Sequence, residues 1–127
     1  MAASAALALA ATDQLANDLI TAVYSDGTNF WAATANGKIY KYTIATGALV
    51  GVVASLNQRI TAMIVYSTHL LVATDKGRIH SFTLSSMAIE ATDPILTLDS
   101  AITAMDLNST TVIIATAKGT IYNYTVS

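Results

Sequence analysis

The feature that most constrains the fold is a threefold internal repeat. The tripeptide Ile-Thr-Ala begins at residues 20, 60 and 102, so its copies lie 40 and 42 residues apart. Each copy leads to a glycine 17 residues after its isoleucine, at Gly37, Gly77 and Gly119. A fixed period of about 40 residues predicts one supersecondary unit that occurs three times. The two-residue difference falls after the second glycine, near Asp93 and Pro94, where a loop absorbs it.

Each unit has the pattern of short β-strands. In the first unit, residues 20–24, 30–35, 38–44 and 49–54 are rich in β-branched and aromatic residues. Asp-Gly, Asn-Gly and Thr-Gly dipeptides lie between these runs, and Asn-Gly indicates a hairpin because both residues tolerate positive φ. Four short antiparallel strands in every 40 residues are typical of a β-propeller blade. The predicted fold class is therefore all-β.

The repeated phrase resembles the WD-repeat family of β-propellers over residues 20–127. It consists of Ile-Thr-Ala, a short polar turn, an apolar strand that ends in Ala-Thr, and Gly-x-Ile-x-x-aromatic. The Trp-Asp pair of that family is replaced by an aromatic residue and threonine, with Tyr42, Phe82 and Tyr124 as the aromatic residues, and no Gly-His dipeptide precedes a repeat. The first repeat contains Tyr-Thr-Ile-Ala-Thr-Gly at residues 42–47 and also resembles quinoprotein-type repeats. The resemblance implies a propeller that serves as a binding platform.

The repeats predict a single unit of three four-stranded antiparallel blades. We expect blade 1 at residues 20–59, blade 2 at 60–101 and blade 3 at 102–127. Blade 3 would lack its own fourth strand, because residue 127 coincides with the end of its third strand. Residues 1–19 would form a linker and a latch strand.

The latch strand is expected at the apolar run 6–11. Leu9 precedes Ile20 by 11 residues, just as Leu49 precedes Ile60. Propellers close with four to eight blades, so three blades leave two sheet faces uncovered. We expect half of a six-bladed ring that a second chain completes, either a second copy or a different propeller half. The alternative is that the chain is a fragment of a longer propeller.

The composition favours burial against other protein. Hydrophobic residues make up 54% and charged residues 11% of the chain, against about 25% charged residues in ordinary soluble domains. No stretch approaches the roughly 18 apolar residues of a membrane-spanning helix, so we expect a protein partner and no membrane insertion. The net charge of −2 argues against a nucleic-acid partner. The first residues lack the positive start of a signal peptide, which favours a cytoplasmic or assembly-bound location over secretion.

Five of the six basic residues lie in or just after the glycine turns. They are Lys38, Lys41, Lys76, Arg78 and Lys118. If these turns share one rim, the basic residues would attract an acidic partner. The alternative is that they are ordinary solvated charges, offset by aspartates on the same rim, for which the candidates are Asp13, Asp18, Asp75 and Asp99.

No set of residues points to catalysis, a metal or a cofactor. His69 and His80 lack the spacing of a metal pair or a catalytic triad, the chain has no cysteine, and no phosphate-binding glycine loop is present. The predicted function is a non-catalytic protein–protein interaction scaffold, a structural subunit of a larger cellular or viral assembly. The alternative is a small-molecule or glycan-binding, lectin-like propeller. It would use threonine hydroxyls near the channel or an aromatic shelf, for which the candidates are Thr34, Thr74, Thr116, Trp31, Tyr40, Tyr42, Phe82, Tyr122 and Tyr124.

Overall fold

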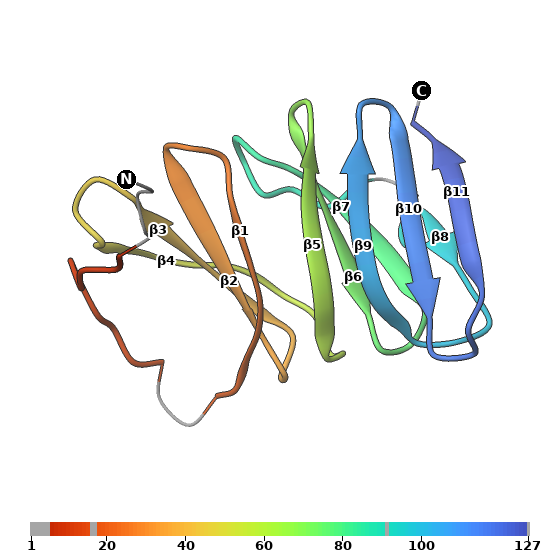
Figure 1. Ribbon diagram of the computed structural model, residues 1–127, viewed down its shortest axis with the longest axis horizontal. Coiled ribbons are helices and arrows are strands. Elements are labelled where there is room, and N and C mark those ends of the chain that lie inside the picture. Colours follow the sequence, from red (N-terminus) through yellow and green to blue (C-terminus); the bar gives the residue numbers. More distant parts are fainter. Residues whose placement is uncertain (1–5, 16–17, 91, 127) are drawn as a thin grey trace, which may run out of the picture.

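The computed structural model describes residues 6–15, 18–90 and 92–126, and these residues form three antiparallel sheets without a helix (Figure 1). Blade 1 contains β1 (Ile20–Ser25), β2 (Asn29–Thr34), β3 (Lys38–Thr43) and β4 (Leu49–Ser55). Blade 2 contains β5 (Ile60–Tyr66), β6 (His69–Thr74), β7 (Arg78–Thr83) and β8 (Leu96–Thr97). Blade 3 contains β9 (Ile102–Asn108), β10 (Thr111–Thr116) and β11 (Ile121–Thr125). The predicted all-β class is confirmed.

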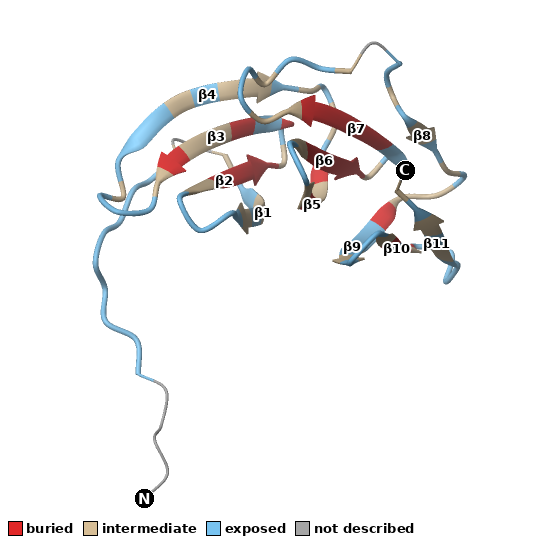
Figure 2. Cartoon of the chain, turned by 90° about the horizontal axis from the view of Figure 1, so that it is seen from above, coloured by how far each residue is buried: buried red, intermediate tan, exposed pale blue. Residues whose placement is uncertain are grey.

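The three sheets stand side by side like consecutive propeller blades. In each sheet the strands follow one another in sequence order, so every pairing is a hairpin between chain neighbours. The first strands β1, β5 and β9 lie next to each other, and the later strands fan outward from them (Figures 1 and 2). This is the arrangement of propeller blades around an axis, with β1, β5 and β9 nearest to that axis.

Alternation along the strands gives each blade two apolar faces. Leu70 and Val72 of β6 pack toward blade 1, whereas Leu71 and Ala73 of the same strand pack toward blade 3. We call the face toward the preceding blade the rear face and the face toward the following blade the front face. The core between blades 1 and 2 joins a front face to a rear face, and the core between blades 2 and 3 does the same.

The glycine turns form as predicted, but the reason given for Asn36 is wrong. Gly37 adopts a φ of 86° and its N–H donates to the carbonyl of Thr34 at 3.0 Å. Asn36 is not among the residues with positive φ. Its side chain instead donates from Nδ2 to Oδ1 of Asp18 at 3.0 Å. The turn therefore needs one left-handed residue, which explains why Lys76 and Lys118 occupy the position of Asn36 in the other repeats.

The fourth strands differ in length. Strand β4 has seven residues, whereas β8, expected at residues 95–98, has two, with one more bridge between Phe82 and Ile89. The loop between β7 and β8 holds Pro94, which has no N–H to donate to a neighbouring strand. The outer edge of β7 is nevertheless covered, because the N–H groups of Glu90, Ile95 and Leu98 donate to the carbonyls of Ser81, Ile79 and Gly77 at 2.9, 2.9 and 2.8 Å.

The predicted latch strand does not form within the single chain. Residues 6–15 are described without regular structure, and Leu7 and Leu9 are 102% and 83% exposed. The segment lies beside blade 1, where Asp13 Oδ2 accepts a hydrogen bond from the Tyr42 hydroxyl, and it extends away from the blades toward residue 6 (Figure 2). Residues 1–5 and 16–17 of the predicted latch and linker, and Ser127 at the end of blade 3, lie outside the described residues.

Candidate interaction surfaces

Four of the five predicted basic residues lie where the blades carry their glycine turns. Lys38, Lys76, Arg78 and Lys118 are exposed at or beside the β2–β3, β6–β7 and β10–β11 turns, at the lower end of Figure 1. Lys41 is set apart from them. Its Nζ lies 5.9 Å from the centroid of the buried Trp31 ring, in a cation–π contact.

Acidic residues accompany this rim. Lys118 Nζ lies 3.8 Å from Asp99 Oδ2, with both side chains mostly exposed, and Asp75 belongs to the same turn as Lys76. Asp18 lies at this end as well, bonded to Asn36. Asp13 does not, because it contacts Tyr42 near the opposite end of β3. The role of the basic residues in partner binding stays a prediction.

Two of the three aromatic residues at the repeat positions pack between blades. Phe82 is 4% exposed in the core between blades 1 and 2, and Tyr124 contributes to the next core. Tyr42 stacks on Phe30 with ring centroids 4.7 Å apart, and its hydroxyl donates to Asp13 Oδ2 at 2.7 Å. Burial and this hydrogen bond raise the pKa of Tyr42 to about 12. Because Trp31, Tyr42 and Phe82 are buried, they do not form an exposed aromatic shelf.

The repeated threonines stabilise turns. Thr34 and Thr74 are fully buried, and their Oγ1 atoms accept hydrogen bonds from the backbone N–H groups of Lys38 and Arg78 at 3.1 and 3.3 Å. These hydroxyl oxygens are therefore occupied by the chain itself. Thr116 is also buried, and within the described residues its Oγ1 has no hydrogen-bond partner.

The rear face of blade 1 is an apolar sheet face without a blade against it. Its residues are Ile20, Val23, Phe30, Ala32, Tyr42 and Ile44, which correspond at a spacing of 40 to Ile60, Met63, Leu70, Val72, Phe82 and Leu84 of blade 2. Ile20 and Val23 are 47% and 61% exposed, whereas Ile60 and Met63 are 0% and 5% exposed. Residues 8–13 cover part of this face and enclose a cavity of about 380 Å³ with it.

The front face of blade 3 is uncovered in the same way. Ile113 and Ile121 correspond at a spacing of 42 to the buried residues Leu71 and Ile79 of blade 2. Ile121 is 72% exposed. The same face carries Asp106 in the place of Ile64, so it is less uniformly apolar than the front face of blade 2.

The outer edge of β11 has an empty place for a further segment. In blade 1 the N–H of Leu56 donates to the carbonyl of Gly37 at 2.7 Å, and in blade 2 the N–H of Leu98 donates to Gly77 at 2.8 Å. A Cβ atom on Gly77 would lie 2.6 Å from the carbonyl oxygen of Leu98, whereas one on Gly119 would meet no atom within 4 Å. Among the described residues, no segment occupies this place in blade 3.

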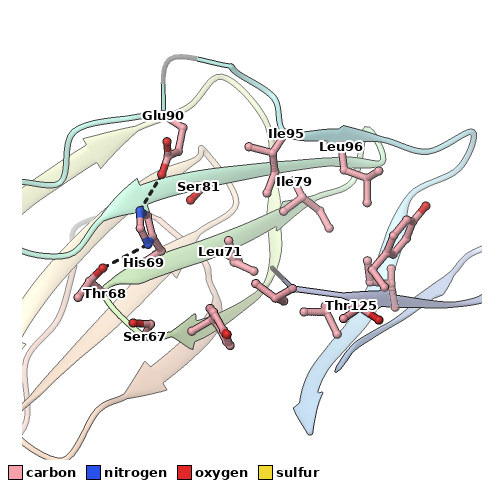
Figure 3. Close-up of a pocket in the computed structure, with 15 residues that line it drawn as sticks. Ser67, Thr68, His69, Leu71, Ile79, Ser81, Glu90, Ile95, Leu96 and Thr125 are labelled. Atoms are coloured by element: carbon pink, nitrogen blue, oxygen red, sulfur yellow. Dashed lines mark hydrogen bonds and ion pairs between the residues drawn. The ribbon is translucent and has the colours of Figure 1, made fainter. Parts of the chain in front are cut away.

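A pocket of about 560 Å³ lies between blades 2 and 3. Leu71 and Ile79 line it from blade 2, and Val112, Ile114 and Tyr124 line it from blade 3. Figure 3 shows Leu71, Ile79 and Leu96 facing Thr125 across this space, with His69 and Glu90 at one side. His69 Nε2 lies 2.7 Å from Glu90 Oε1, and its Nδ1 lies 3.3 Å from the Thr68 hydroxyl.

A second histidine–carboxylate pair lies on blade 2. His80 Nδ1 is 2.6 Å from Asp93 Oδ1, and its buried Nε2 has no hydrogen-bond partner among the described residues. Sequence analysis missed this pair and the pair of His69 and Glu90, because each acidic partner lies in the irregular segment between β7 and β8. Within the described ranges, no group of three or more histidine or acidic residues is placed to hold a metal ion. Those ranges also contain no helix long and apolar enough to span a membrane.

Comparisons with known proteins identify the fold only. No protein-family model matches the sequence, and no curated protein matches it. Among solved structures, the chain is similar to the WD40 repeats of RRP9, with 14% identity, a TM-score of 0.75, and coverage of 89% of this chain and 37% of that one. The structure of U3-55K matches with 13% identity, a TM-score of 0.75, and coverage of 89% of this chain and 38% of that one.

Two computationally designed proteins are also similar. Ika8 matches with 21% identity, a TM-score of 0.71, and coverage of 84% of this chain and 33% of that one. Ika4 matches with 14% identity, a TM-score of 0.64, and coverage of 91% of this chain and 96% of that one. The chain thus spans about a third of the length of Ika8, RRP9 and U3-55K, and nearly all of Ika4. The predicted propeller-like fold is confirmed, whereas no family model supports the resemblance to WD repeats.

Proposed function

We propose that this protein is a non-catalytic interaction scaffold whose first partner is a second copy of itself, and that the two copies close into a six-bladed ring. The observation that carries the proposal is the correspondence of its two open ends. The front faces of blades 1 and 2 pack on the rear faces of blades 2 and 3. The remaining rear face of blade 1 and front face of blade 3 are the two halves of that same interface.

The exposed residues at these ends supply a driving force for association. Val23 at one end and Ile121 at the other are 61% and 72% exposed. Full burial of a large aliphatic side chain stabilises by about 1.5–3 kcal/mol relative to exposure. A head-to-tail contact that closes after two copies forms two identical interfaces and leaves no blade face open.

The empty place beside β11 is proposed to receive the N-terminal segment of the other copy. An extended segment can add to a free sheet edge through backbone hydrogen bonds, while alternate side chains enter the adjacent apolar surface. Leu7 and Leu9 are exposed, alternate with alanines, and belong to the segment 6–15 that forms no strand in its own chain. In the ring this segment would leave the rear face of its own blade 1 free for blade 3 of the partner.

The closed ring would then act as a structural subunit of a larger assembly. Its rim would carry two sets of the exposed residues Lys38, Lys76, Arg78 and Lys118. Asp18, Asp75 and Asp99 offset part of this charge, and the remaining excess of basic residues favours an acidic protein surface as the further partner. Thr34, Thr74, Tyr42 and Phe82 support a non-catalytic role, because each is engaged in turns or packing.

The test is the molar mass in solution, measured by size-exclusion chromatography with light scattering. We expect twice the chain mass of 13.3 kDa for the unmodified protein. Val23→Asp and Ile121→Asp should each give monomers, whereas Ser85→Asp, an exposed position on neither open face, should remain dimeric. A folded, unmodified monomer at about 100 µM, well above typical assembly constants, would contradict the proposal.

Mixing the two variants distinguishes head-to-tail closure from a symmetric contact. In a pair formed by one Val23→Asp chain and one Ile121→Asp chain, both changes fall into one interface and the other interface is unmodified. We therefore expect the mixture to recover dimers that neither variant forms alone. A contact between two copies of the same face would not recover, because every pair would keep a changed residue.

A further inference from the structure

We propose that the cavity between blades 2 and 3 binds a small, free, planar aromatic molecule of about the size of indole. The cavity lies within one chain, so this inference does not depend on ring closure. It rests on a difference between the two blade interfaces that the repeat makes directly comparable.

The first interface fills this space with a residue of the chain. Trp31 of blade 1 is 1% exposed, and Lys41 extends over its ring. The residues 40 positions later are Leu71 and Ser81, and both line the cavity. Two large side chains in one interface are thus replaced by two smaller ones in the next. The volume that an indole ring occupies between blades 1 and 2 is open between blades 2 and 3.

The outer wall of the second interface is built from a less regular strand. In blade 1 the seven-residue strand β4 contributes Val53 and Ala54 to the core. In blade 2 the corresponding strand β8 has two residues, and Ile95 and Leu96 border the cavity there. The pocket opens to solvent beside the β5–β6 turn, where the exposed residues Ser67 and Thr68 line it. The cavity is consequently an accessible pocket and not a closed packing defect.

The lining has the character of a ligand site. Its volume of about 560 Å³ falls within the roughly 300–1,000 Å³ of ligand pockets, which are mostly apolar with a few polar groups. Empty apolar cavities in proteins bind aromatic molecules. Leu71, Ile79, Val112 and Ile114 supply flat apolar walls for such a ring.

One polar group would fix the orientation of a ligand in the pocket. Ser81 is 4% exposed and lines the pocket, and Figure 3 draws no hydrogen bond from it to the other lining residues. Its hydroxyl can accept a hydrogen bond from a ring N–H. At the mouth, His69 and Glu90 are already paired with each other. The ligand class is therefore an aromatic ring with a single N–H or O–H donor directed to Ser81.

The test uses indole as the probe in calorimetric titration and in methyl NMR. We expect saturable binding with one site per chain. Leu71→Trp places an indole ring in the cavity and should weaken binding at least tenfold, and Ser81→Ala should weaken it about threefold or more. Val50→Trp, an added tryptophan on the exposed β4 of blade 1, should bind like the unmodified chain. Unchanged affinity in Leu71→Trp would overturn the proposal.

The NMR measurement on the unmodified chain keeps the proposal testable if Leu71→Trp does not fold. Indole should shift the methyl resonances of Leu71, Val112 and Ile114, which face the cavity. Those of Leu70 and Val72 should not shift, because they lie on the opposite face of β6. Absence of saturable shifts up to the solubility limit of indole, or equal shifts on both faces of β6, would overturn the site.

Discussion

The glycine turns show how one residue type serves two different constraints. Gly77 and Gly119 adopt similar φ values of 76° and 83°. A Cβ on Gly77 would lie 2.5 Å from the carbonyl oxygen of Ser100, whereas a Cβ on Gly119 would meet open space. Gly77 is thus required by close backbone approach as well as by its dihedral angle, and Gly119 in the single chain by its dihedral angle alone.

Alanine substitutions at these two positions should therefore differ in cost. We expect Gly119→Ala to lower the free energy of unfolding by about 1–2 kcal/mol through left-handed strain. Gly77→Ala should lower it by about 2–4 kcal/mol, because backbone must also move. Urea denaturation of both variants, followed by circular dichroism in dilute solution, provides the measurement. Equal losses in the free energy of unfolding would show that the backbone at Ser100 moves away from the added Cβ without an energetic penalty.

Tyr42 gives the protein a specific response to alkaline pH. Its pKa is raised to about 12 in the folded chain, against about 10 in an unfolded one. The stabilisation linked to this group is complete below pH 10 and is lost as the pH rises from about 10 to 12. In that range the unfolded chain releases the phenolic proton and the folded chain retains it.

Tyr42→Phe should remove this component of the pH dependence. For the monomer in dilute solution at pH 8, we expect the free energy of unfolding to fall by about 1 kcal/mol, because the hydrogen bond to Asp13 disappears. Between pH 10 and 12 the difference in the free energy of unfolding between the variant and the unmodified chain should become smaller. Tyr40→Phe is the control, because it removes another tyrosine hydroxyl of the same strand and leaves the bond between Tyr42 and Asp13 in place. A difference in the free energy of unfolding that stays constant over this range would mean that the pKa of Tyr42 is not raised in the folded chain.

At the scale of elements, a single substitution in each blade interface should give it the packing of the other interface. Trp31→Leu should open the first interface and lower the free energy of unfolding by about 2–4 kcal/mol, as large-to-small changes in a core do. Leu71→Trp should be neutral or should raise the melting temperature, because it fills existing space. Thermal unfolding without added ligand measures both. A loss above about 2 kcal/mol for Leu71→Trp would indicate overpacking and a cavity too small for indole.

The strands of the blades could be predicted from sequence because their pairings are local. Residues 20–24, 38–44 and 49–54 match β1, β3 and β4 to within one residue at each end, since turn chemistry and alternation suffice to define a hairpin. The turns at Ser67 and Ser109 gave no such signal, yet both residues adopt positive φ, at 54° and 58°. Their short loops require left-handed residues even where glycine is absent.

The pocket could not be predicted, because it depends on volumes contributed by separate blades. The positions of Trp31 and Leu71 were equivalent in the repeat, but both are apolar, and a pattern of apolar residues does not state how much space lies opposite them. The short β8 and the pairing of His69 with Glu90 likewise follow from the path of residues 84–90 and 92–95, which belong to none of the named strands. Sequence pattern defines which face a residue occupies, whereas packing across blades decides what remains open.

At the scale of the whole molecule, the three blades leave two faces without a neighbouring blade. These are the rear face of blade 1 and the front face of blade 3. Each blade that lies in the middle of a row buries both of its faces, as blade 2 does here. The ends can satisfy the same rule only against other blades, and the second copy is the partner proposed above. The place beside Gly119 would then be occupied as it is beside Gly37 and Gly77.

Gly119→Ala tests that occupancy without changing either open face. In the ring, an added Cβ would meet the donated segment, as it would meet the Leu98 carbonyl at Gly77. We expect the dimer dissociation constant, measured by sedimentation at several concentrations, to rise at least tenfold. Gly27→Ala is the matched control, because Gly27 has a φ of 94° and equally open surroundings but lies in the β1–β2 turn. If both variants dissociate equally, backbone strain explains the effect and no segment passes over Gly119.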